Sequence, residues 1–148
     1  MTAPTHFLAG LIVGELTGNY PAAIAGSFLI DSDHLLSYYW HGILRNPKAL
    51  LQAFMDDKDP WDDQRNYLHS VFAWGYLSLL WSIVHLSSGL IFSLSYFVHL
   101  TLDALENSVF YPFYPNKTIV LQGPITYFSK QEFILDIALL FIFIYMIL

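Results

Sequence analysis

The sequence contains no cysteine, which excludes disulfide bonds, thiolate nucleophiles and metal sites built on cysteine. Charged residues are also scarce: they make up 12% of the 148 residues, against roughly 25% in an average soluble domain. Only six residues are Lys or Arg and the net charge is −6, so the chain lacks the basic surface that nucleic-acid binding requires. No nucleic-acid partner is therefore expected, and any metal must be bound by His, Asp or Glu.

Hydrophobic residues dominate instead, at 55% of the chain, and the mean hydropathy is +0.47. This composition predicts a membrane protein, and a length of 148 residues favours a single domain, residues 1–148. The start of the chain lacks the basic region of a signal peptide and is expected to be mature sequence. We therefore expect an all-α integral-membrane bundle of about four to five apolar helices plus an interfacial segment.

The apolar runs that are expected to form helices cover residues 4–17, 21–36, 67–86, 90–105 and 133–148. In the first run, Gly10, Gly14 and Gly18 lie four residues apart and form a smooth ridge against which another helix can pack closely. The run 67–86 has no Asp, Glu, Lys or Arg over its 20 residues, which makes it the clearest transmembrane candidate. Residues 90–105 are expected to return antiparallel to it.

Basic residues all fall at one end of this expected arrangement. They are Arg45, Lys48, Lys58, Arg65, Lys117 and Lys130. The positive-inside rule places that end in the cytoplasm, as in a multi-pass protein of the inner (plasma) membrane. The intervening segment 38–66 begins with aromatic residues and contains the acidic loop Asp56–Asp63, so it is expected to be interfacial and to offer a docking site for a soluble protein.

Seven ionisable residues lie within or beside the apolar runs, where the burial of charge is costly and points to a function. They are His6, Asp31, Asp33, His34, His69, His99 and Asp103. His99 and Asp103 are four residues apart and share one helix face, so both can reach the same metal ion. The expected topology brings all seven residues to the basic end of the bundle, and this shared depth predicts a metal site.

Each of these residues, taken singly, also has a structural interpretation. A histidine at the start of a helix can be interfacial or hydrogen-bonded, and an aspartate can cap a helix. His41 and His85 are interpreted in this way because they lie apart from the other candidates. Taken together, the mixed His and carboxylate set suits Zn²⁺, with Mn²⁺ or Fe²⁺ as alternatives, and it is large enough for one or two ions.

Two neighbouring ions activate a bridging water and stabilise the charge that develops during displacement at a phosphoester. The predicted metal ligands are His6, Asp31, His34, His69, His99 and Asp103. Asp33 is expected to act as the general base towards the bound water or as a bridging ligand. Arg65, four residues before His69, is the basic residue best placed to bind a substrate phosphate.

Four segments resemble the membrane-bound metal-dependent hydrolases of bacteria and archaea, also described as LexA-binding, inner-membrane-associated hydrolases. They are His6, LIDSDHL at 29–35, RNYLHS at 65–70 and HLTLD at 99–103. The resemblance covers about residues 5–115 and implies a distant relationship to zinc phospholipase C and nuclease P1, helical phosphodiesterases with a multi-metal site. Gln64 stands where the family has a histidine, and Glu106 stands where it often has threonine and offers an extra carboxylate.

The ligand set and the resemblance together predict a membrane-bound metal-dependent hydrolase of phosphoester bonds in lipid or lipid-linked substrates. The alternative is a non-enzymatic membrane module, in which a metal ion or polar cluster joins the helices and the acidic loop docks a soluble partner. Metal-ion transport ranks last, because the run 67–86 offers ligands only at its ends.

Overall fold

The computed structural model describes residues 1–55, 61 and 63–148, and these residues form helices but no strand of a sheet. The elements are α1 (Ala3–Thr17), α2 (Tyr20–Phe28), η1 (Leu29–Asp31), α3 (Ser32–Trp40), η2 (Ile43–Arg45), α4 (Pro47–Met55), α5 (Val71–Val84), α6 (Leu86–Leu105) and α7 (Lys130–Ile147), where η denotes a 3₁₀ helix. The predicted all-α fold is confirmed.

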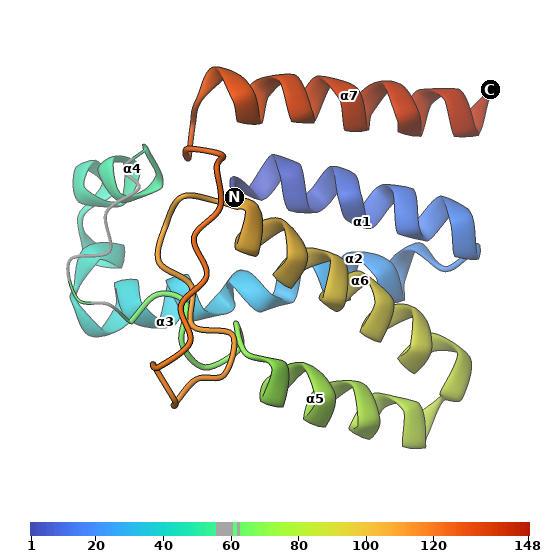
Figure 1. The fold of residues 1–148 in the computed structure, drawn as a ribbon, viewed down its shortest axis with the longest axis horizontal. Coiled ribbons are helices and arrows are strands. Elements are labelled where there is room, and N and C mark those ends of the chain that lie inside the picture. Colours follow the sequence, from blue (N-terminus) through green and yellow to red (C-terminus); the bar gives the residue numbers. More distant parts are fainter. Residues whose placement is uncertain (56–60, 62) are drawn as a thin grey trace.

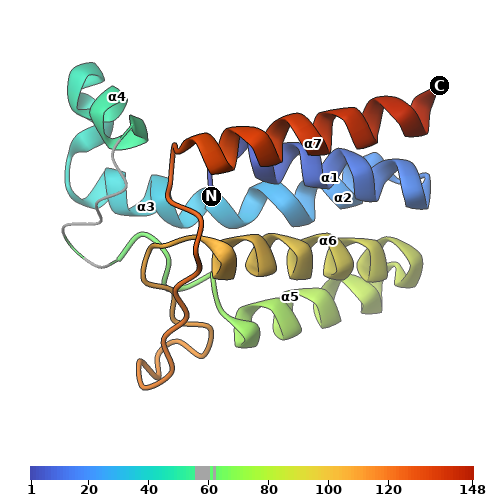
Figure 2. The same ribbon diagram turned by 45° about the horizontal axis from the view of Figure 1, so that its top comes forward.

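Helices α1, α2, α5, α6 and α7 run alongside one another as a bundle (Figures 1 and 2). Helix α6 contacts α1, α2 and α5, while α7 packs on α1 at the edge of the bundle. Helices α3 and α4 and the segment 106–129 gather at one end, which we call the loop end (Figure 1). The α1–α2 and α5–α6 turns and the C-terminus lie at the opposite end, which we call the far end.

Close helix contacts at two glycines hold the centre of the bundle together. A Cβ atom on Gly10 would overlap the Ser27 side chain of α2, and one on Gly26 would overlap the carbonyl oxygen of Phe92 in α6. The predicted close packing along the glycine ridge is thus confirmed at Gly10. Gly18 has another role, because it ends α1 in the left-handed conformation, with φ 70°.

The predicted continuous helix over residues 21–36 is interrupted by the 3₁₀ turn η1. This turn places Asp31 at the junction of two helices, while Asp33 falls in the first turn of α3. The Asp33 carboxylate accepts the backbone N–H of Leu68 at 2.6 Å. A contact with a segment more than thirty residues away in the chain cannot be read from helical periodicity, so the interruption was not foreseen.

The run 67–86 does not form the transmembrane helix that its composition predicts. Helix α5 begins only after Ser70, whose side chain caps the N–H of Ala73, and it ends at Val84, 14 residues in all. The prediction of a 20-residue span was wrong because residues 67–70 are used to bring His69 to the centre of the protein. In the described part of the chain, α6 is the one helix long and apolar enough to cross a membrane, and 44% of its most apolar window is buried inside the protein.

The outward faces of α5 and α7 are strongly apolar. Ile83 and Val84 at the end of α5 are 73% and 85% exposed, and Phe141 and Tyr145 of α7 are 67% and 83% exposed. Exposed apolar side chains of this kind are a feature that helices share when they face lipid or another protein.

Candidate metal centre

Six side chains from four separate parts of the chain meet where the bundle joins the loop end. They are His6 of α1, Asp31 of η1, His34 of α3, His69 of the segment before α5, and His99 and Asp103 of α6. All are fully buried except Asp31 and His34, which are partly exposed. The structure therefore brings together every residue that the sequence predicts as a metal ligand, in three overlapping groups of possible ligands.

Hydrogen bonds orient the two central imidazoles. Nδ1 of His99 lies 2.7 Å from the carbonyl oxygen of Ser27, and Nδ1 of His69 lies 3.3 Å from the carboxylate of Asp33. Both oxygens can only accept, so both Nδ1 atoms carry the proton. The two Nε2 atoms then face each other at 3.2 Å. Their lone pairs repel unless a proton or a metal ion lies between them.

Two carboxylates face the same point as these nitrogens. Oδ2 of Asp103 lies 3.1 Å from Nε2 of His99 and 3.4 Å from Nε2 of His69. Oδ1 of Asp31 lies 3.7 Å and 3.6 Å from the same two nitrogens. The geometry predicted for His99 and Asp103 from their spacing is thus observed, and two segments distant in sequence complete the set.

The remaining two histidines, His34 and His6, adjoin this arrangement. His34 presents Nε2 to Asp31 at 3.7 Å, while its Nδ1 is held by the side-chain oxygen of Gln64 at 3.1 Å. His6 stacks on His99 with ring centroids 3.8 Å apart. Asp31 belongs to both the His6–His99 group and the His34–His69 group, so it would be available to an ion held by either group. Gln64 acts here through His34.

Unsatisfied polar atoms test whether the centre fits a metal ion. In the described residues, both ring nitrogens of His6 and Oδ2 of Asp103 are buried without a hydrogen-bond partner. Leaving such a group unpaired costs roughly 1–3 kcal/mol. A divalent cation would satisfy the Asp103 oxygen and one nitrogen of His6, and the mixed nitrogen and oxygen donors suit Zn²⁺, Mn²⁺ or Fe²⁺. The residues present therefore fit such an ion.

The electrostatics of the centre differ between His69 and His34. Burial lowers the pKa of His69, but its hydrogen bonds with Asp31 and Asp33 and the charge of Asp103 outweigh burial and raise the pKa to about 9. Burial, and after it the charge of His69, lowers the pKa of His34 to about 4. At neutral pH, His34 can bind a metal directly, whereas His69 holds a proton that a metal ion would have to displace.

The two residues predicted as catalytic lie beside the ligands rather than among them. Asp33 is 3% exposed and lies behind His69, where it holds Nδ1. Nη2 of Arg65 lies 3.0 Å and 2.9 Å from the two carboxylate oxygens of Glu106. Glu106 also accepts the hydroxyl of Ser108 at 2.6 Å and belongs to none of the ligand groups in the described residues. Its role in orienting Arg65 had no signal in the sequence.

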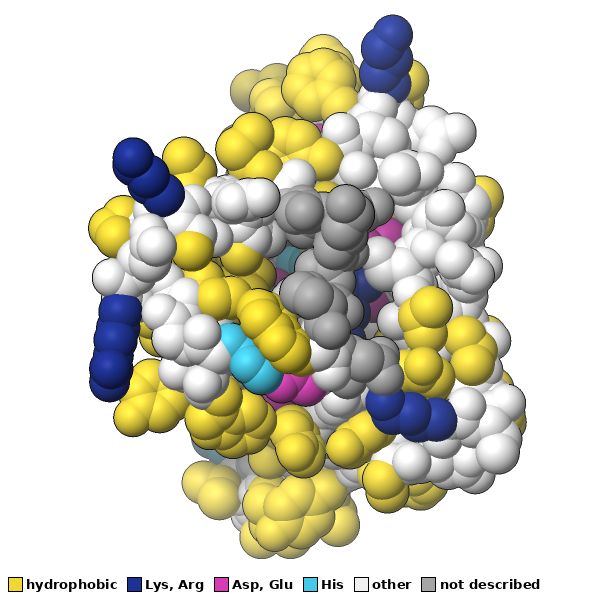
Figure 3. All heavy atoms as spheres, turned by 90° about the vertical axis from the view of Figure 1, so that its left-hand side faces the viewer, with side chains coloured by type: hydrophobic (Ala, Val, Ile, Leu, Met, Phe, Trp, Pro, Cys, Tyr) yellow, Lys and Arg dark blue, Asp and Glu magenta, His cyan; other side chains and the backbone are white. Residues whose placement is uncertain are grey.

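A cavity of about 720 Å³ opens beside the centre at the loop end. Asp31, His34 and Arg65 are among the residues that line it. In Figure 3, which faces the loop end, acidic, basic and histidine side chains are visible among apolar ones. Most of the predicted acidic loop, 56–60 and 62, lies outside the described residues. Its last residue, Asp63, accepts the hydroxyl of Ser37 at 2.6 Å.

Comparisons with known proteins add no further information on the activity. No protein-family model matches this chain, and no similar protein was found among curated proteins or solved structures. The function has to be inferred from the geometry of the centre.

Proposed function

We propose that this protein is a membrane-bound metal-dependent hydrolase that cleaves phosphoester bonds with a metal-activated water. The observation that carries the proposal is the set of inward-facing nitrogens: three Nδ1 atoms are held by oxygen acceptors, so that Nε2 of His34, His69 and His99 is directed at Asp31 and Asp103. Histidines oriented in this way by neighbouring oxygens are typical of metal ligands. The order of the four segments that resemble membrane-bound metal-dependent hydrolases supports the same proposal.

The roles proposed for the residues of the centre follow from whether each side chain lines the cavity or is buried. His6, Asp31, His34, His69, His99 and Asp103 are the proposed ligands of one or two ions, with Zn²⁺ first and Mn²⁺ or Fe²⁺ as alternatives. A bound ion would lower the pKa of a coordinated water and stabilise negative charge on the phosphoryl oxygens. Asp31 and His34 line the cavity, so the reactive side of the centre faces it. Arg65, anchored by Glu106, would bind the substrate phosphate.

Asp33 remains a candidate for two roles. The general-base role requires its carboxylate to reach the bound water, but the observed contacts direct Oδ2 to Leu68 and His69. These contacts favour a role in orienting His69, and we adopt this role for Asp33.

The membrane location is part of the proposal. It is supported by the apolar outward faces of α5 and α7 and by the position of the basic residues, since η2, α4 and the start of α7 all lie at the loop end. Lys58 lies outside the described residues. We propose a multi-pass protein of the inner membrane with the loop end in the cytoplasm. Because the chain has no cysteine, single cysteines at Lys48 and Ser88 should be labelled from opposite sides of the membrane.

The test of the activity uses protein purified in a mild detergent. Metal content is measured after supplying zinc or manganese, and hydrolysis of bis(p-nitrophenyl) phosphate is followed with and without a chelator. We expect at least one ion per chain and hydrolysis that the chelator abolishes. A folded protein that binds no ion under either condition contradicts the proposal.

The non-enzymatic membrane module remains the second candidate. The observation that favours it is that the ligands come from α1, η1, α3 and α6, so a bound ion would hold four elements together whether or not it is catalytic. This candidate predicts that removal of the metal lowers the melting temperature and that no phosphoester is hydrolysed by the loaded protein.

A further inference from the structure

The proposed ligand His69 lies on a short segment that is not helical. Helix α5 begins at Val71, and Ser70 before it has an extended backbone. The backbone groups of such a segment lack the partners that a helix would give them, so they need partners from elsewhere in the protein. The position of His69 therefore depends on which groups hold the residues beside it.

Leu68, the residue before His69, is held through both of its backbone groups. Its N–H donates to Oδ2 of Asp33 at 2.6 Å, and its carbonyl oxygen accepts the hydroxyl of Tyr96. Within the described residues, no backbone N–H donates to this carbonyl. The carbonyl of Leu68 and the N–H of His69 belong to one planar peptide group. The Tyr96 hydroxyl thus fixes the peptide plane from which His69 projects.

The contact with Asp33 leaves the imidazole of His69 loosely held. Nδ1 of His69 lies 3.3 Å from Oδ2 of Asp33, whereas the N–H of Leu68 lies 2.6 Å from the same oxygen. Hydrogen bonds from nitrogen to oxygen are usually about 2.7–3.2 Å long, so the contact with the ring is at the weak end of the range. The backbone that carries the ring has to be fixed by another group.

Tyr96 is suited to this task because it is itself fixed in the core. Its side chain is fully buried and makes an edge-to-face contact with Phe92, with ring centroids 5.6 Å apart. Tyr96 also lies three residues before His99 on α6, so the two residues share a helix face. Helix α6 therefore carries both His99 and the hydroxyl that locates His69.

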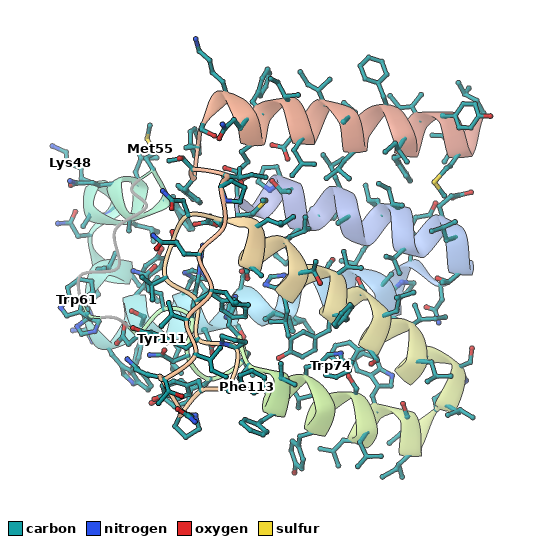
Figure 4. All side chains as sticks on the ribbon, in the orientation of Figure 1. Lys48, Met55, Trp61, Trp74, Tyr111 and Phe113 are labelled. Atoms are coloured by element: carbon teal, nitrogen blue, oxygen red, sulfur yellow. The ribbon has the colours of Figure 1, made fainter. Side chains whose placement is uncertain are left out.

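A separate contact holds α5 in place against α6. The indole N–H of Trp74 donates to the carbonyl oxygen of Ser93 at 2.9 Å, and Figure 4 shows Trp74 where α5 faces α6. Loss of the Tyr96 hydroxyl should therefore leave α5 docked and act on the peptide before His69.

We infer that Tyr96 is a positioning residue of the candidate metal centre. Through the carbonyl of Leu68, its hydroxyl holds Nε2 of His69 opposite Nε2 of His99, where the two nitrogens lie 3.2 Å apart. The inference rests on the proposed function, in which His69 binds a metal ion, and deepens it by adding a residue that touches no ion. Tyr96→Phe tests it, because this substitution keeps the ring in the core and removes the hydroxyl.

Ser95→Ala is the matched control. Ser95 precedes Tyr96 on α6, is fully buried and also donates its hydroxyl to a backbone carbonyl, that of Ala23 in α2, at 2.6 Å. Each substitution removes one hydroxyl of a buried side chain, but Tyr96→Phe alone frees a carbonyl that adjoins a proposed ligand. Both variants should lower the melting temperature, so stability does not separate them.

The first measurement uses the metal-free full chain in a mild detergent and follows the imidazole nitrogens of isotope-labelled histidine by NMR. The signals of His69 are identified by their loss in His69→Gln. We expect Tyr96→Phe to shift these signals and Ser95→Ala to leave them in place. Unchanged signals of His69 in Tyr96→Phe, or equal shifts in both variants, would overturn the inference.

The second measurement titrates the same variants with Co²⁺, whose visible absorption depends on the geometry of its ligands. Tyr96→Phe should bind Co²⁺ about tenfold more weakly, the lower end of the usual cost of losing a group that supports a ligand. Its absorption spectrum should also change. Ser95→Ala should keep both the affinity and the spectrum. Equal weakening in both variants would show a general loosening of the bundle, and the inference would be wrong.

Hydrolysis of bis(p-nitrophenyl) phosphate, measured separately, distinguishes failure of the inference from failure of the proposed function. A protein whose Co²⁺ binding depends on Tyr96 but that hydrolyses no phosphoester would disprove the hydrolase and keep the positioning role. Metal-dependent hydrolysis, together with Co²⁺ binding that Tyr96→Phe leaves unchanged, would keep the hydrolase and disprove the positioning role.

Discussion

Two buried acidic regions adjoin α1, and they differ in how their carboxylates are satisfied. At the contact between α1 and α7, Glu132 is 2% exposed, and it accepts the N–H groups of Thr2 and Phe128 at 2.5 Å and 2.7 Å. In the candidate metal centre, Asp103 is equally buried, and its Oδ1 atom accepts the N-terminal ammonium group of Met1 at 2.9 Å, but its Oδ2 atom has no donor among the described residues and faces histidine nitrogens. Burial of an acid is therefore not in itself a sign of metal binding.

The two regions differ in the kind of group that contacts each carboxylate. Glu132 meets N–H and O–H donors, which satisfy an anion completely and fix the start of α7 against α1. Asp103 meets Nε2 of His99, which carries a lone pair because Nδ1 donates to Ser27. Two lone pairs directed at one point require a proton or a metal ion between them. Four experiments test this difference between the two acidic regions.

The largest effect is expected for His99→Ala, because it removes an imidazole at the centre of the ligand set. Metal affinity should fall by at least about a hundredfold, and metal-dependent hydrolysis should be lost with it. Metal content and titration with a metal indicator measure the change. His85→Ala is the control. His85 lies at the start of α6, at the far end of the bundle, so this substitution should leave both properties unaltered. If His99→Ala keeps full metal occupancy and activity, the cluster is structural.

A smaller effect is expected for Asp33→Asn, which weakens the group that orients His69 but removes no ligand. Metal affinity should fall about 10–100-fold, the usual cost of losing such a partner. Metal titration decides between the two roles considered for Asp33. Unchanged affinity with a rate reduced about 10²–10⁴-fold would instead identify Asp33 as the general base.

The proton on His69 predicts how metal binding depends on pH. An ion must displace this proton, so the apparent association constant should rise up to about tenfold per pH unit between neutral pH and about 9, and then level off. The metal-free protein should show the opposite trend. The raised pKa stabilises the folded chain at pH values below 6.5, the ordinary pKa of a histidine, and this contribution is lost as the pH rises through about 9. Metal titrations and melting curves across this range, with His69→Gln as control, test both statements.

The smallest effect on metal binding is expected for Glu132→Gln. The amide nitrogen cannot accept from Thr2 or Phe128, so one buried N–H loses its partner and the protein should be destabilised by about 1–3 kcal/mol. Chemical denaturation measures this loss. Metal affinity should stay within a factor of two of the original protein. A large loss of metal affinity would show that the two acidic regions are coupled, and the comparison would fail.

Helical patterns in the sequence predicted the residues of the candidate site better than they predicted where the helices begin and end. The spacing of His99 and Asp103 gave their shared face, because neighbours on one helix are fixed by its pitch. Composition predicted that residues 67–70 belong to a helix, and this prediction was wrong. These residues lie outside α5 because His69 is held by Asp33 and the N–H of Val71 donates to the carbonyl oxygen of Pro112. Hydropathy describes how apolar a segment is and contains no information about its contacts with distant segments.

The sequence by itself determined that the chain forms apolar helices and that the seven candidate site residues fall at one end of them. Both follow from local rules: helix periodicity, and the reversal of direction at each turn. Only the tertiary structure decided which nitrogen of each histidine faces inward, that Arg65 is held by Glu106, and that α4 supplies Phe54 to a cavity. These features depend on contacts between segments far apart in the chain, and such contacts form only when the whole bundle is packed.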